Sequence, residues 1–170
     1  MGQGLSRRAI LAGGGGALAA GAVVGGGVTM HLGAPAPGAL TLTAREMVVI
    51  DAVAEILFPG DPFPLNGIEA EVARDVDRIV GEVLEPLHAT AFRYVLRALE
   101  WGTLAGRGRR FSRLPESVRA DVLATWKEPE TVARRVAGDS LRVVLGMAYF
   151  SHPEILASMG WRATCGGDSV

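Results

Sequence analysis

Prolines and helix-capping residues divide residues 41 to 161 into segments whose apolar side chains recur every three or four positions. This spacing is typical of amphipathic helices, and no strand alternation of useful length interrupts it. Thr43 and Glu46 form a predicted capping box, in which each side chain bonds the backbone N–H of the other residue. Roughly 130 residues follow the N-terminal region, which is enough for one ordinary core. We therefore predict an all-α fold, a single domain of about five helices behind an N-terminal apolar segment.

The five helices are expected over residues 44 to 57, 68 to 84, 86 to between 101 and 104, 114 to 127 and 129 to 150. Three prolines between residues 59 and 64 end the first helix, and Pro86 suits the first position of the third. The predicted inward residues of the first three helices are Met47, Ile50, Val53, Ala54, Leu57, Ile68, Val72, Val76, Ile79, Val80, Val83, Phe92, Val95, Leu96 and Leu99. The predicted outward residues of the second helix are Glu71, Arg74, Asp75, Asp77 and Arg78. Residues 141 to 150 are apolar nearly all round, which predicts a helix at the centre of the fold or under a partner.

The N-terminal region combines an arginine pair with an uncharged, glycine-rich apolar run. Arg7 and Arg8, followed by Ile10 and Leu11, resemble a twin-arginine (Tat) export signal, which Tat translocase reads on folded bacterial proteins. Ile10 stands where phenylalanine is commonest, and Ala12 replaces the frequent lysine. The alternative is a plain membrane anchor whose arginines obey the positive-inside rule. Eight glycines between residues 9 and 32 weaken the hydrophobicity of the run and favour the export signal.

The removal of this leader is left open by the sequence. The best small-x-small cleavage site, Ala34 to Ala36, is followed by Pro37, which signal peptidases generally reject at that position. The 22 uncharged residues from 9 to 30 exceed the roughly 20 that cross a bilayer as a helix. The membrane is therefore a predicted partner through residues 9–32. Residues 33 to 40 are expected to be a linker, which gives a division into 1–40, signal or anchor plus linker, and 41–170, helical domain.

Charge and residue composition weigh against several other classes of function. Only Arg7 and Arg8 of the 17 basic residues precede Thr41, so the domain carries 15 basic and 18 acidic residues and has no predicted face for nucleic acid. The lone Cys165 forbids an internal disulfide. His88 and His152 are 64 residues apart and each fits a surface or turn role, so no metal site is predicted. Gly106 to Arg110 are predicted to form an exposed loop, and no catalytic constellation emerges.

Three blocks of sequence, in order, resemble the subunit 3 (small, or gamma) family of membrane-bound gluconate 2-dehydrogenase and related flavin-dependent dehydrogenases. The first is Leu42 to Glu46, the second is Ile56 to Asp61, and the third joins Phe150–Glu154 to Gly160–Trp161. They look like the family patterns L-T-x-x-E, L-I-P-x-D and F-x-x-P-E…G-W. The resemblance covers about residues 41 to 162, and the tail beyond Trp161 is shorter than in many relatives.

The resemblance implies a non-catalytic subunit with no cofactor in this chain. In the family, a large subunit of the glucose-methanol-choline (GMC) oxidoreductase type carries FAD and the substrate site, often with a multihaem cytochrome c that passes electrons to quinone. The small subunit supplies the Tat signal for the large one and helps its assembly. This chain would then lie at the periplasmic side of the bacterial inner membrane. A free-standing membrane-anchored adaptor is the alternative, and a small enzyme is a third reading.

Two regions are candidate partner interfaces. Trp161 follows a glycine near the C-terminus, and aromatic residues dominate binding hot spots. Phe58, Pro59 and Phe63 lie in the proline-rich loop, whose rigidity would reduce the entropy lost on docking.

Overall fold

The computed structural model describes residues 32–127 and 131–161, and all regular structure in these ranges is helical. Five longer helical segments, α2 (Ala44–Leu57), α3 (Val72–Arg78) with its π-helical continuation η1 (Ile79–Val83), α4 (Pro86–Gly102), α6 (Glu116–Lys127) and α7 (Val132–Phe150), match the five expected. Shorter pieces are α5 (Leu104–Arg107), the 3₁₀ turn η2 (Phe111–Arg113) and α8 (Pro153–Ser158). The predicted all-α class is confirmed. The Tat-like motif and Cys165 lie outside the described residues.

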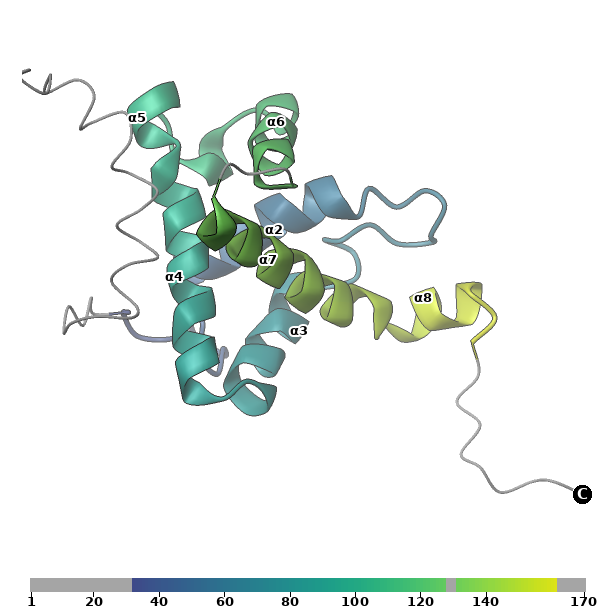
Figure 1. Cartoon of the computed structure of the whole chain (residues 1–170). Helices are drawn as coiled ribbons and strands as arrows, with labels where there is room; N and C mark the ends of the chain where they lie inside the picture. Colours follow the sequence, from purple (N-terminus) through teal and green to yellow (C-terminus); the bar gives the residue numbers. More distant parts are fainter. Residues whose placement is uncertain (1–31, 128–130, 162–170) are drawn as a thin grey trace, which may run out of the picture.

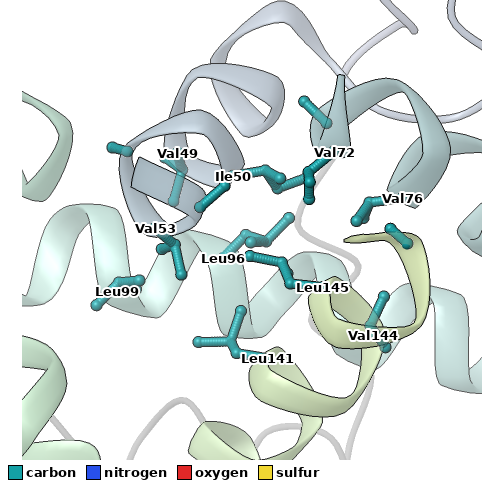
Figure 2. Packing of buried hydrophobic residues seen from close by; sticks show 14 of the residues in the cluster. Val49, Ile50, Val53, Val72, Val76, Leu96, Leu99, Leu141, Val144 and Leu145 are labelled. Carbon is teal, nitrogen blue, oxygen red and sulfur yellow. The ribbon is translucent and has the colours of Figure 1, made fainter. Parts of the chain in front are cut away.

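α7 lies at the front of the domain, where it crosses α2 and α3 and has α4 and α6 on either side (Figure 1). α8 continues beyond the end of α7 and projects from the body of the domain (Figure 1). Figure 2 shows valines, isoleucine and leucines from four of these helices meeting in one core. Its labelled members are Val49, Ile50, Val53, Val72, Val76, Leu96, Leu99, Leu141, Val144 and Leu145. In the described ranges, no helix is long and apolar enough to cross a bilayer.

The start of α2 follows the sequence prediction closely. The Thr43 hydroxyl accepts from the backbone N–H of Glu46 at 3.3 Å, and the Glu46 carboxylate accepts from the Thr43 N–H at 2.8 Å. The capping box is therefore confirmed. Ile50, Val53 and Ala54 are fully buried as expected, whereas Met47 and Leu57 are only partly buried.

The second helix begins four residues later than expected. Turns occupy residues 67 to 71, and Asn66 caps them by accepting from the N–H groups of Ile68 and Glu69. A Cβ on Gly67 would stand 2.7 Å from the carbonyl oxygen of Ala54, so this turn passes directly against α2. Regular helix starts only at Val72, and the predicted inward residue Ile68 is exposed.

At its other end this helix widens into the π-helical segment η1, and two predictions about its faces are wrong. Val83 was expected inside and is exposed. Asp77 was expected on the polar side, yet it is 4% exposed and accepts three backbone hydrogen bonds, from the N–H groups of residues 40, 41 and 42. A carboxylate can be buried where backbone donors satisfy it, and periodicity alone does not reveal those donors.

The segment before α2 is held to the domain at its two ends. Asp77 holds residues 40 to 42, and within the segment the Ala36 N–H donates to the Leu42 carbonyl at 2.8 Å. Further back, the Leu32 carbonyl accepts from Arg93 Nη2 at 2.7 Å and from Arg97 Nη2 at 2.5 Å. The segment expected to be a linker is thus held at both ends, to α4 through Leu32 and to α3 through residues 40 to 42, while most residues between are exposed.

Candidate subunit interface

Helix α7 carries apolar side chains on two opposite sides. Thr131 caps its start, with the hydroxyl accepting from the Arg134 N–H, and the helix continues to the turn before Pro153. One side is the buried side and contains Leu141, Val144, Leu145, Ala148 and Tyr149. The other side points away from the core, and helical spacing aligns five of its apolar residues in one row. We call this row the outer stripe of α7; it consists of Val132, Val136, Val143, Met147 and Phe150.

The outer stripe remains uncovered over the described part of the chain. Its members are 40 to 77% exposed, with Met147 at 51%. Of the two expectations for this helix, enclosure at the centre of the fold is wrong, because only one side is enclosed. The sequence feature that indicated this exposed side was the apolar character of residues 141 to 150 on nearly all sides of the helix. The exposed Asp139, which pairs with Arg142, interrupts the row between Val136 and Val143. Exposed apolar side chains gathered on one helix face are still more typical of an interface than scattered ones.

An aromatic cluster closes the C-terminal end of α7 against the proline-rich loop. The ring of Phe58 stacks on Tyr149 with centroids 4.1 Å apart and planes 7° apart. Phe63 meets Tyr149 edge-on at 5.9 Å and Phe150 at 5.6 Å. The Tyr149 hydroxyl donates to the Leu65 carbonyl at 2.6 Å. Burial raises the pKa of the Tyr149 phenol, which keeps it neutral and able to donate.

The chain continues from this cluster into α8 and Trp161. His152 caps α8, with its Nδ1 accepting from the Glu154 N–H at 3.3 Å, and Pro153 takes the first position. Gly160 has a φ of 69°, which favours glycine and ends the helix. Trp161 follows with 58% of its surface exposed.

The predicted interface residues divide into two groups. Phe58 and Phe63 are partly buried, and their rings serve internal packing against α7. Pro59 and Trp161 are exposed and available to another molecule. Their role in binding stays a prediction. Arg7, Arg8, Ile10 and Leu11, the predicted Tat residues, lie outside the described residues.

Two arginine contacts to the buried carboxylate of Glu46 were missed by the sequence analysis. Arg93, which is 8% exposed, and Arg97 both donate to the carboxylate of Glu46, which is 3% exposed. Arg93 Nη2 lies 3.0 Å from Glu46 Oε2, and Arg97 Nε lies 3.3 Å from Oε1. The four-residue spacing of the two arginines on one helix face, with a glutamate in a capping box, was the available signal.

The described residues offer little for a cofactor or a metal. No three side chains among His, Cys, Asp and Glu gather there in a way that could hold a metal ion. His88 is exposed and 4.0 Å from Glu85, as its predicted surface role requires. A groove of about 210 Å³ between α2, α6 and α7 is lined mostly by apolar side chains, including Leu57, Trp126 and Leu141. That lining brings together no set of groups for acid–base or nucleophilic chemistry.

Taken together, these features define an all-α domain with a row of exposed apolar side chains along one helix. A sequence model of gluconate 2-dehydrogenase subunit 3 matches residues 44–167, and the chain belongs to this family. No curated protein and no solved structure matches the chain.

The blocks that carry the family resemblance have clear structural places. The first block starts α2 and supplies Glu46 to the arginines of α4. The second and third blocks meet in the aromatic cluster, where Phe58 stacks on Tyr149, the neighbour of Phe150. In this chain, the three blocks therefore include residues that hold the N-terminal segment and the end of α7 in position.

Proposed function

We propose that this chain is the non-catalytic small subunit of a membrane-associated, FAD-dependent dehydrogenase complex. In this proposal it supplies the Tat export signal, through Arg7 and Arg8, and helps a GMC-type flavoprotein to assemble. The family match over residues 44–167 is the observation that carries the proposal, because subunit 3 is by name one part of a larger enzyme. FAD and, where a cytochrome c subunit takes part, haem would belong to the partners.

The order of events in export supports the link between the leader and a flavoprotein. FAD is inserted in the cytoplasm, so the flavoprotein has to fold before it crosses the membrane. Tat signals direct folded proteins, and one signal on the small subunit is enough for a bound pair. The complex would reach the periplasmic side of the inner membrane and be anchored or released depending on whether the leader is cleaved.

The outer stripe of α7 is the surface that suits the flavoprotein best. An interface core is apolar and depleted of charge. The stripe offers three valines, a methionine and a phenylalanine, and its part after Asp139, from Val143 to Phe150, contains no charged member. Trp161 on the following segment and Pro59 in the neighbouring loop extend the exposed candidates toward the C-terminal end of α7. We assign the docking surface to these residues.

Affinity purification of the full chain from its native host tests the proposal. The expected co-purifying protein is a flavoprotein with the absorption of bound flavin and with no signal peptide of its own. Recovery of this chain without any redox partner would favour a free-standing adaptor and contradict the proposal. Flavin, metal or turnover in the isolated chain would revive the enzyme reading.

The variant Met147→Arg tests the docking surface. A charge left unpaired in a dry interface costs several kcal/mol, so we expect the recovery of the flavoprotein to fall at least about tenfold. Leu87→Arg is the matched control, because Leu87 is also an exposed apolar residue, at 65%, but lies in the first turn of α4 and outside the outer stripe. Circular dichroism checks that both variants stay helical. Equal recovery with the two variants would contradict the assignment of the stripe.

A further inference from the structure

The connection between α4 and α6 forms a concentrated positive surface on a domain whose net charge is negative. Residues 104 to 115 contain four arginines and no acidic residue, whereas residues 41 to 170 hold 15 basic and 18 acidic residues. We call Arg107, Arg109, Arg110 and Arg113, together with Trp101, the arginine surface. The neighbouring Glu100 is 3% exposed and is occupied by Ser112, whose N–H and hydroxyl donate to it at 3.0 and 2.9 Å.

These arginines are left without acidic partners in the described part of the chain. None of the four lies within 4.0 Å of a carboxylate oxygen, unlike Arg74, Arg78 and Arg142, which pair with acids on their own helices. Arg107, Arg109 and Arg113 are exposed. Leu104, Gly108 and three of the arginines (Arg109, Arg110 and Arg113) line a shallow hollow of about 540 Å³.

Trp101 belongs to the same surface. It is 41% exposed on the last turn of α4, and the Arg110 guanidinium lies over its ring at 4.2 Å. The Arg45 guanidinium approaches the ring at 5.5 Å from the start of α2. A tryptophan among arginines has the composition of a membrane-interface anchor, in which the ring lies at the level of the lipid headgroups.

The fastened N-terminal segment brings this surface close to the leader. Arg97, which holds the Leu32 carbonyl at 2.5 Å, precedes Trp101 by four residues and therefore lies one turn away on the same side of α4. Leu32 follows the uncharged run of residues 9 to 30 by two residues. Two residues span at most about 7 Å. If the leader crosses the bilayer, the chain joins the domain at Leu32, beside the side of α4 that carries Trp101, which favours a position of the arginine surface near the headgroups.

We propose that the arginine surface binds the anionic phospholipid headgroups of the membrane that holds the leader. This proposal rests on the membrane association in the proposed function. Charge complementarity and the short tether favour a lipid surface over an acidic protein. The contact would fix the orientation of the domain so that the outer stripe of α7, on a different helix, stays available to the flavoprotein.

Flotation of the purified full chain with lipid vesicles tests the proposal. Binding is measured to vesicles of phosphatidylcholine with phosphatidylglycerol and to vesicles of phosphatidylcholine alone. The ratio of the first to the second reports the preference for anionic lipid, because apolar insertion of the leader contributes to both. Each arginine near an anionic surface contributes about fivefold in binding at moderate salt, so Arg109→Gln with Arg113→Gln should lower the ratio at least about tenfold. The lipid preference should also decrease as salt rises.

The matched control is Arg74→Gln with Arg142→Gln, which changes the net charge equally at sites outside the arginine surface. Its ratio should stay within about twofold of the parent value, since exposed charges farther away than a Debye length are screened. Equal ratios for the two double variants would overturn the proposal, as would a parent chain indifferent to lipid charge. The same double variant, Arg109→Gln with Arg113→Gln, can also be tested in the affinity purification. If its vesicle ratio is unchanged and it no longer recovers the flavoprotein, the surface binds a protein partner, and the lipid proposal is overturned. None of these vesicle results depends on export or on the flavoprotein.

Discussion

Glu46 accepts hydrogen bonds from the residue that caps its own helix and from two arginines of α4. The cluster of one carboxylate and two guanidinium groups also holds the Leu32 carbonyl. Burial of these charges is tolerated because each has partners in the interior. The same glutamate therefore starts α2 and joins the N-terminal segment to the body of the domain.

The variant Glu46→Gln should strongly destabilise the domain. Removal of one partner from a buried ion pair leaves the other charge uncompensated, which typically costs about 3–5 kcal/mol. Urea denaturation followed by circular dichroism measures this loss. Glu71→Gln is the control, since its pair with Arg74 is exposed and should be worth less than about 1 kcal/mol. A loss for Glu46→Gln no larger than the control's would contradict the buried cluster.

Asp51 on α2 gives a prediction with a definite pH dependence. Burial raises the pKa of Asp51 above the value of the unfolded chain. The folded state then binds the proton more tightly, so this residue's contribution to stability decreases as pH rises from the unfolded pKa to the folded pKa. We expect Asp51→Asn to unfold at a higher denaturant concentration than the parent at pH 7. Below about pH 3.9, the ordinary aspartate pKa, this advantage of the Asn variant should be smaller; an advantage that does not grow as pH rises to 7 would contradict the sign.

At the scale of the helices, close packing between α6 and α7 depends on a glycine. A Cβ on Gly138 would stand 2.6 Å from the carbonyl oxygen of Trp126, whereas a Cβ on Gly146 would meet nothing within 4 Å. Both glycines lie inside α7. The two positions therefore have the same backbone conformation and different surroundings.

Alanine at these two glycines should have opposite effects on stability. Overpacking at Gly138→Ala is expected to cost about 1–3 kcal/mol, which exceeds the gain in helix propensity. Gly146→Ala keeps only the gain, about 0.5–1 kcal/mol relative to glycine. Thermal denaturation of the two variants measures both effects. Stabilisation by both would mean that α6 and α7 do not approach as closely as the structure has them.

The helices were predictable where local chemistry decides their ends. The capping box fixed the start of α2, and Pro86 marked the start of α4. The short helix α8, which begins at Pro153, was not predicted. The start of α3 was not predictable, because Gly67 has to pass against Ala54 and that contact joins distant parts of the chain. Asp77 was misplaced for the same reason, since its three donors belong to residues 35 to 37 positions earlier.

The candidate interface was predictable only in part. The sequence indicated a helix apolar on all sides, and the structure was needed to separate the buried side of α7 from the outer stripe. Phe58 and Phe63 were singled out as interface candidates in a rigid loop, but tertiary packing places their rings against Tyr149. The arginine surface was expected to be an ordinary loop. The proposed lipid contact of this surface depends on the hydrogen bonds from Arg93 and Arg97 to the Leu32 carbonyl. These residues are 61 and 65 positions apart from Leu32 in the sequence.

At the scale of the whole molecule, the domain offers surfaces on different helices for different partners. The outer stripe of α7 is apolar and suits another subunit, whereas the arginine surface between α4 and α6 suits anionic lipid. The N-terminal segment joins the leader to α4 near the second surface. This arrangement fits the proposed function, in which the subunit holds a flavoprotein partner at a membrane.

The most direct test of the central claim is the location of the flavoprotein when the export signal of this chain is disabled. Arg7→Lys with Arg8→Lys keeps the charge of the leader and removes the arginine pair. Cells that express the variant with its native partner are fractionated, and both proteins are quantified in cytoplasm, membrane and periplasm, with Arg74→Lys and Arg142→Lys as the control outside the leader. We predict that both proteins remain in the cytoplasm. Loss of this chain alone from the membrane, with the flavoprotein still exported, would contradict the claim that one carries the signal for the other.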